Sequence, residues 1–228
     1  MKVRSTDCLI DFLAERKQIR KRELISIKND LGKPNVEPKQ QNKRTSILLG
    51  YAHWEGFVKE AARAYVDFVT QKSRGFSSLS HNFKALACRQ ELQVAHSATK
   101  KIKPHLDLVR LLTEEQNRSI TITAATAIDT ESNLDESVFL NICDSIGIDF
   151  AGKWATQGPF MNDLFVNRCK IAHGEIWIPK RAYAVEVLEA VIKWIQDFSA
   201  DIENAAVTSA YLAPMNASQQ CHSPVPPP

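Results

Sequence analysis

Arg168 and His173 lie five positions apart in residues 167–175, which read Asn-Arg-Cys-Lys-Ile-Ala-His-Gly-Glu. An arginine keeps its proton at working pH and its forked guanidinium matches phosphate oxygens. A histidine can both give and take a proton near neutrality. A fixed cation beside a proton shuttle is the minimum needed to cleave a phosphodiester without a metal ion. The pair therefore predicts phosphodiester chemistry.

The spacing of the two residues suits the end of a helix. Positions i and i+5 lie ~140° apart around a helix that turns ~100° per residue, so they share no face in its middle. Residues 161–172 have a helical pattern and Gly174 is a natural stop, which places His173 at the tip. Two copies meeting across a two-fold axis would bring two such pairs into one cleft. On spacing alone, the simpler explanation is that both side chains meet the negative end of the helix dipole.

Three stretches, in order, add weight to the chemical interpretation. Residues 51–59 contain Glu-Gly-Phe in a helical pattern, residues 132–147 form a capped segment ended by glycine, and residues 167–175 follow. Together they resemble the HEPN superfamily of helical ribonucleases, in its toxin-like bacterial branch of RiboL-PSP-HEPN type, over roughly residues 40–200. Residues 167–175 are similar to its Arg-x(4–6)-His signature. The resemblance implies an all-α, usually dimeric domain that cuts RNA without metal. If His173 moves the proton of a ribose 2′-hydroxyl and Arg168 holds the phosphate, the product is a 2′,3′-cyclic phosphate.

Three further residues are candidates to support this site. The family usually has a polar residue, most often Asn, directly after the motif arginine, whereas this chain has Cys169, which donates and accepts weakly. This departure predicts reduced activity unless another group compensates. Glu55 lies among apolar neighbours and needs a partner, which Arg168 or His173 could provide, although a surface ion pair is the alternative. Lys170 would add charge for RNA or remain a solvated lysine.

No metal or cofactor is expected. Cys169 and His173 could share a helix face as two zinc ligands, but no neighbouring Cys or His cluster supplies the others. The expected partners are RNA, a second copy of the chain and, by resemblance, an antitoxin that is a minimal nucleotidyltransferase or another small protein. The setting implied is a toxin–antitoxin or phage-defence system. Two alternatives stay open, namely a non-catalytic HEPN-like module that binds RNA, nucleotide or protein, and a purely structural helical dimer.

The composition indicates a globular protein without a membrane span. The chain has 228 residues, of which 44% are hydrophobic and 24% charged. No apolar run approaches the ~20 residues of a membrane-spanning helix, and residues 1–7 lack the apolar stretch of a secretory signal. Five scattered cysteines favour reduced thiols in a cytoplasmic protein. Residues 1–44 hold twelve basic against six acidic residues, a basic end that could attract a polyanion or dock on the acidic residues 119–152.

The pattern of apolar residues predicts an all-α helical bundle with one small β insertion. Residues 119–128 alternate threonine with aliphatic residues, which indicates a strand. Residues 1–40 are expected to form an N-terminal helix and loop, 41–212 the HEPN-like domain, and 213–228 a disordered proline-rich tail. Thr6 or Asp7 is expected to cap the first helix, and Asn133 the helix before the motif. The expected helices are 6–30, 43–72, 81–100, one opened by Pro104, 134–146, 161–172 and 182–211.

Overall fold

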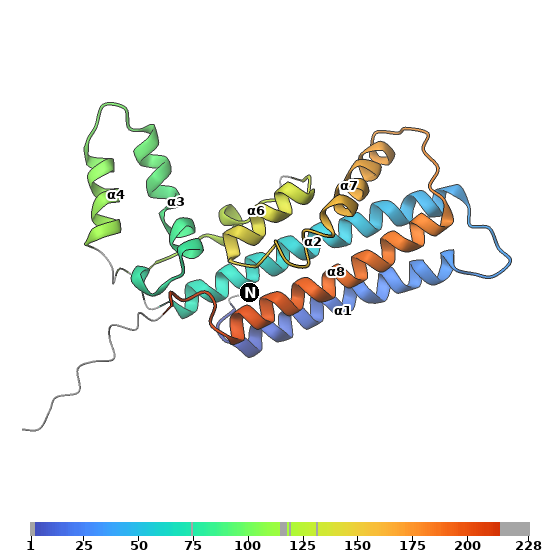
Figure 1. Cartoon of the computed structure of the whole chain (residues 1–228), viewed down its shortest axis with the longest axis horizontal. Coiled ribbons are helices and arrows are strands. Elements are labelled where there is room, and N and C mark those ends of the chain that lie inside the picture. The colour runs from blue at the N-terminus through green and yellow to red at the C-terminus, as the bar shows by residue number, and fades with distance from the viewer. Residues whose placement is uncertain (1–2, 74, 115–117, 119, 131, 215–228) are drawn as a thin grey trace, which may run out of the picture.

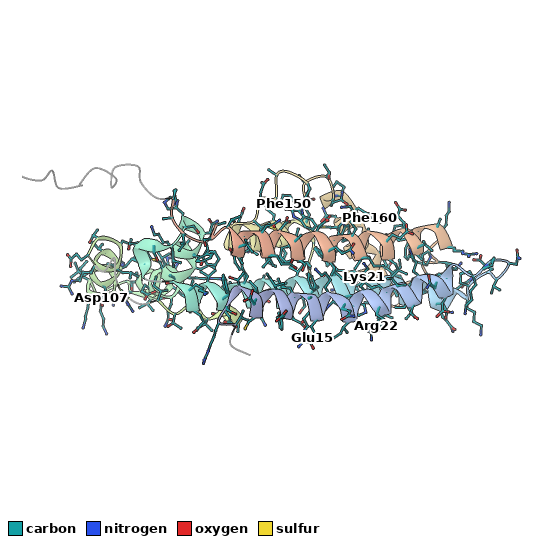
Figure 2. The ribbon with its side chains drawn as sticks, turned by 90° about the horizontal axis from the view of Figure 1, so that it is seen from below. Glu15, Lys21, Arg22, Asp107, Phe150 and Phe160 are labelled. Carbon is teal, nitrogen blue, oxygen red and sulfur yellow. The ribbon has the colours of Figure 1, made fainter. Side chains whose placement is uncertain are left out.

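The computed structural model describes residues 3–73, 75–114, 118, 120–130 and 132–214. Three long helices run side by side along the molecule: α1 (Thr6–Leu31), α2 (Gln40–Lys72) and α8 (Arg181–Val207) (Figure 1). α2 is central because it packs on α1, α8 and α7. Figure 2, seen from below, shows α1 and α8 side by side, with Glu15 and Arg22 on the outer side of α1.

The remaining elements lie along one side of these three helices. α6 (Glu136–Ile146) and α7 (Gly158–Ala172) pack on α2. α3 (His81–Ser97) and α4 (Lys103–Thr113) form an arm that projects from the bundle at the end away from α7 (Figure 1). Two short elements complete the described part, the 3-10 helix η1 (Phe76–Ser78) and α5 (Ala124–Ala127). The fold is therefore all-α, as the sequence predicts.

An aromatic cluster joins the bundle to the α6–α7 layer. The ring of Trp54 on α2 lies 5.9 Å from that of Trp154, 5.5 Å from that of Trp194 and 5.1 Å from that of Phe139. Each of these side chains is almost fully buried. Aromatic pairs at these separations stabilise beyond the area that they bury. Four elements or loops distant in sequence are thus held in one core. Phe160 of α7 packs against the same core, with its ring 5.8 Å from that of Trp194.

The strand predicted over 119–128 is wrong. No strand occurs in the described residues, and α5 takes up residues 124–127 of this segment, while residue 119 lies outside them. The alternation is used instead to bury Ile122, Ala124 and Ile128 against the bundle. A strand needs a neighbour to pair with, and no segment of the described part of the chain provides one.

Helix boundaries differ from the predicted ones mainly at the caps. Ser5, rather than Thr6 or Asp7, caps α1 and accepts a hydrogen bond from the Cys8 amide. Asp135, rather than Asn133, caps α6 through the Val138 amide at 2.9 Å. Several residues of similar capping propensity stand together at both places, so sequence alone does not choose among them.

Two further outcomes concern the arm and the chain end. Leu92 and Val94, which the helical pattern of residues 81–100 places inside, are about half exposed. Of the predicted tail, residues 215–228 lie outside the described residues, whereas Ala213 donates its amide to the Ser78 carbonyl at 2.9 Å. Within the described residues, no helix has the length and apolarity to cross a bilayer.

Candidate functional site

Arg168 is held in place by groups from two segments, helix α2 and the residues just before α6. Its Nη2 donates to the Ser132 carbonyl at 2.7 Å and lies 3.9 Å from Glu55 Oε2. The guanidinium carbon lies 4.1 Å from the centre of the Tyr51 ring, a cation–π distance. The side chains of Arg168 and Glu55 are 19% and 20% exposed, so the pair is only partly screened by water. The structure therefore presents a largely immobilised cation on α7.

The residues under Arg168 are themselves fixed. Thr130 Oγ1 donates to Glu55 Oε1 at 2.8 Å, and the Tyr51 hydroxyl accepts the Leu134 amide at 2.6 Å. Burial, with the Glu55 carboxylate adding in the same direction, raises the pKa of Tyr51 to about 12. The Tyr51 hydroxyl thus stays protonated at neutral pH. α2 and the segment before α6 together form a rigid platform for the guanidinium.

Cys169 contacts the guanidinium on its other nitrogen. Arg168 Nη1 lies 3.7 Å from Cys169 Sγ, and thiol sulfur is a weak acceptor. Nη1 therefore keeps most of its capacity to donate to a stronger acceptor such as a phosphate oxygen. The departure from the family pattern at this position leaves one nitrogen of the fork weakly engaged.

His173 ends α7 and is exposed. Its amide donates to the Cys169 carbonyl at 2.9 Å, and no side-chain hydrogen bond or ion pair of its ring occurs in the described part of the chain. The Gly174 amide donates to the Ile171 carbonyl and the Glu175 amide to the Lys170 carbonyl, a Schellman motif. The structure places His173 five residues beyond Arg168 at the helix tip, and among the described interactions no hydrogen bond joins the two side chains.

Replacing Gly174 with alanine is expected to destabilise this helix end. Gly174 has φ +81°, where an L residue is strained, although an added Cβ would meet nothing within 4 Å. The free energy of unfolding should fall by ~1–2 kcal/mol in Gly174→Ala. Gly174→Asn should lose less, because asparagine tolerates this region. Chemical denaturation of the three proteins tests this; an equal or smaller loss in the alanine variant contradicts it.

A polar cluster around the buried Asn167, which the sequence did not reveal, braces the same turn. Asn167 is 5% exposed; its amide nitrogen donates to Asp163 Oδ1 at 3.0 Å and to the Tyr183 hydroxyl at 2.9 Å. The Tyr183 hydroxyl donates to Asp163 Oδ2 at 2.7 Å, and Lys170 Nζ lies 3.4 Å from Asn167 Oδ1. Burial, together with the hydrogen bond to Asp163, raises the pKa of Tyr183. The cluster ties the last turns of α7 to the start of α8.

The only sequence signal for this cluster is an asparagine directly before the motif arginine. Lys170 belongs to the cluster, so its charge is placed near the end of α7.

In the described residues, no three His, Cys, Asp or Glu side chains gather closely enough to hold a metal ion. Glu55 and Cys169 thus lie beside the Arg168 guanidinium, and Lys170, two residues further along the helix, is tethered to Asn167.

The fold and the helix-end pair define the class of protein. An all-α bundle that carries Arg-x4-His at the end of a helix is typical of HEPN domains. The RiboL-PSP-HEPN family model matches residues 15–208, and the chain belongs to this family. No curated protein and no solved structure matches the chain.

Proposed function

We propose that the protein is a metal-independent endoribonuclease in which Arg168 and His173 carry the reaction. The observation that supports this most is the contrast between the two side chains. Arg168 is anchored by Ser132, Glu55 and Tyr51, whereas His173 is exposed at the end of the same helix. A catalytic cation must be preorganised, and a proton shuttle must reach the substrate.

The reaction would use the ribose itself as the nucleophile. His173 takes the proton of the 2′-hydroxyl, the 2′-oxygen bonds to phosphorus, and the P–O5′ bond breaks. The same proton, or one from a second imidazole, passes to the 5′-oxygen, so the products are a 2′,3′-cyclic phosphate and a 5′-hydroxyl. Arg168 Nη1, which contacts the weak acceptor Cys169 Sγ, donates to the phosphate as its negative charge grows. Lys170 adds a second positive charge.

Two copies of the chain would complete the cleft. One helix end supplies one imidazole, whereas both a base and an acid are needed for the transfer. Two α7 ends meeting across a two-fold axis would supply two imidazoles and two guanidinium groups. In this proposal the enzyme is a toxin, and its antitoxin, a minimal nucleotidyltransferase or another small protein, would block this cleft.

Cleavage in the presence of EDTA tests the proposed function. Wild-type protein is expected to cut single-stranded RNA equally well with and without millimolar EDTA, and to leave the DNA of the same sequence intact because it lacks the 2′-hydroxyl. Loss of cleavage in EDTA, or cleavage of DNA at a similar rate, contradicts the proposal.

One observation favours a second candidate, a module that binds RNA without cutting it. Glu55 already lies 3.9 Å from Arg168 and offsets its charge. Such a module would bind RNA with an affinity that falls steeply with salt, because phosphate contacts release counterions. It would produce no new RNA ends. The EDTA experiment separates the two candidates when binding and cleavage are measured on the same samples.

A further inference from the structure

α4 is a helix whose outer face is left uncovered by the described residues. It packs on α3 in the projecting arm, and Leu111 is its buried residue (Figure 1). Ile102, Leu106 and Val109 are 70%, 46% and 53% exposed. They recur at positions i, i+4 and i+7, so they form one stripe along about two turns. A stripe of this kind marks an interaction site rather than scattered surface residues.

The apolar surface continues from this stripe toward α3. A hollow of about 380 Å³ lies between the two helices, and its lining includes Leu92, Leu108 and Cys88. Only one flank of α4 is charged. Its charged residues are Lys103, Asp107, Arg110 and Glu114. The helix thus has a wide apolar arc, of which α3 covers only part.

The order of charges on this flank would let it pair with the same flank of a second copy of the chain. Along the helix the signs alternate as Lys103, Asp107, Arg110 and Glu114, and Asp107 lies at the far end of the molecule (Figure 2). Suppose that two such helices run antiparallel and that the two-fold axis passes between residues 108 and 109. Lys103 then lies opposite Glu114 of the second copy. The same axis sets Asp107 opposite Arg110 of the second copy. Both pairs occur twice, because a two-fold contact is reciprocal.

We propose that α4 is a contact between two copies of this chain, which pack their apolar stripes antiparallel and pair these four charges across a two-fold axis. The weak Arg110–Asp107 pair within one helix, at 3.9 Å and more than half exposed, can exchange for pairs between copies. Nucleic acid would not cover an apolar stripe, and an unrelated protein would not require charges that match under two-fold symmetry.

The contact is small and separate from the motif. A helix of 11 residues is ~16 Å long, so it buries less than the ~800 Å² per partner of a standard interface and should associate in the micromolar range. α4 and α7 stand at different ends of the molecule (Figure 1). The inference therefore does not rest on the proposed function. If α7 ends also meet, the assembly exceeds a dimer.

Two charge-swap variants test the contact. Lys103→Glu/Arg110→Glu makes the flank wholly negative, and Asp107→Lys/Glu114→Lys makes it wholly positive. Each variant should repel its own copy, and the dissociation constant should rise on the order of 10-fold or more. The mass in solution is measured by light scattering at roughly 10–100 µM, a range that spans the expected dissociation constant. It should fall in each variant, to that of a monomer if α4 is the sole contact and to that of a dimer if α7 ends also meet, and it should rise again in an equimolar mixture.

Three outcomes overturn the proposal. They are a wild-type protein that is monomeric throughout this range, variants that keep the wild-type mass, and a mixture that fails to restore it. All four substitutions introduce good helix formers at exposed positions, so melting temperatures should not fall below that of the wild type. Cleavage by the wild type and by His173→Ala, measured separately, reports on the proposed function alone.

Discussion

Replacing His173 with alanine is expected to lower the rate of RNA cleavage ~10²–10⁴-fold, the usual contribution of a general acid or base. The fold should be unaffected, because the ring is exposed and has no hydrogen bond or ion pair in the described residues. Initial rates on a labelled single-stranded RNA and melting temperatures of both proteins measure the two effects separately.

His96 provides a matched control. It is also exposed and lies in the last turn of a helix, α3, far from the motif. His96→Ala should therefore retain wild-type cleavage. Equal activity of His173→Ala and wild type, or an equal loss in both histidine variants, would show that the imidazole of His173 has no special role.

Replacing Arg168 with alanine is expected to lower cleavage ~10²–10³-fold, the loss typical of removing one preorganised donor to a developing negative charge. It should also reduce stability by ~1–3 kcal/mol, because the Ser132 carbonyl and the half-buried Glu55 carboxylate lose a partner. Arg168→Lys should recover little activity. A lysine has no fork with which to hold the Ser132 carbonyl and a phosphate at once.

An Arg63→Ala variant distinguishes a loss of catalysis from a loss of stability. Its guanidinium donates to the carbonyls of Ile128 and Ala125, so Arg63→Ala also leaves backbone acceptors unpaired. It should lose stability but keep its cleavage rate per folded molecule. If Arg63→Ala and Arg168→Ala lose activity in proportion to stability, Arg168 serves the fold and not the reaction.

The long helices could be predicted from sequence because their apolar residues recur with the helical period over many turns. α2 illustrates this, since its apolar stripe is wide enough to face three neighbours. The local sequence pattern did not predict the structure correctly where packing against distant segments determines the conformation or the burial of a residue. The alternation over 119–128 was interpreted as pairing in a sheet, yet it reflects burial against the bundle. Leu92 and Val94 fit the period of α3 but lie on an arm with too few neighbours to cover them.

The residues of the candidate site also fall into those that the sequence predicts and those that only the tertiary structure reveals. Arg168 and His173 are found from a short local motif, and Glu55 from a carboxylate among apolar residues. The Ser132 carbonyl and the Tyr51 ring could not be predicted, because they reach Arg168 only after α2, α7 and the segment before α6 have packed. A backbone carbonyl carries no sequence signal at all.

The most direct test of the central claim is the chemistry of the RNA ends. A substrate cut at one dominant position should yield a 2′,3′-cyclic phosphate and a 5′-hydroxyl, identified by mass spectrometry. A single 2′-deoxy substitution on the 5′ side of that position should abolish the cut there. Production of 3′-hydroxyl and 5′-phosphate ends, or an undiminished cut beside the deoxyribose, would contradict a reaction driven by Arg168, His173 and the 2′-hydroxyl.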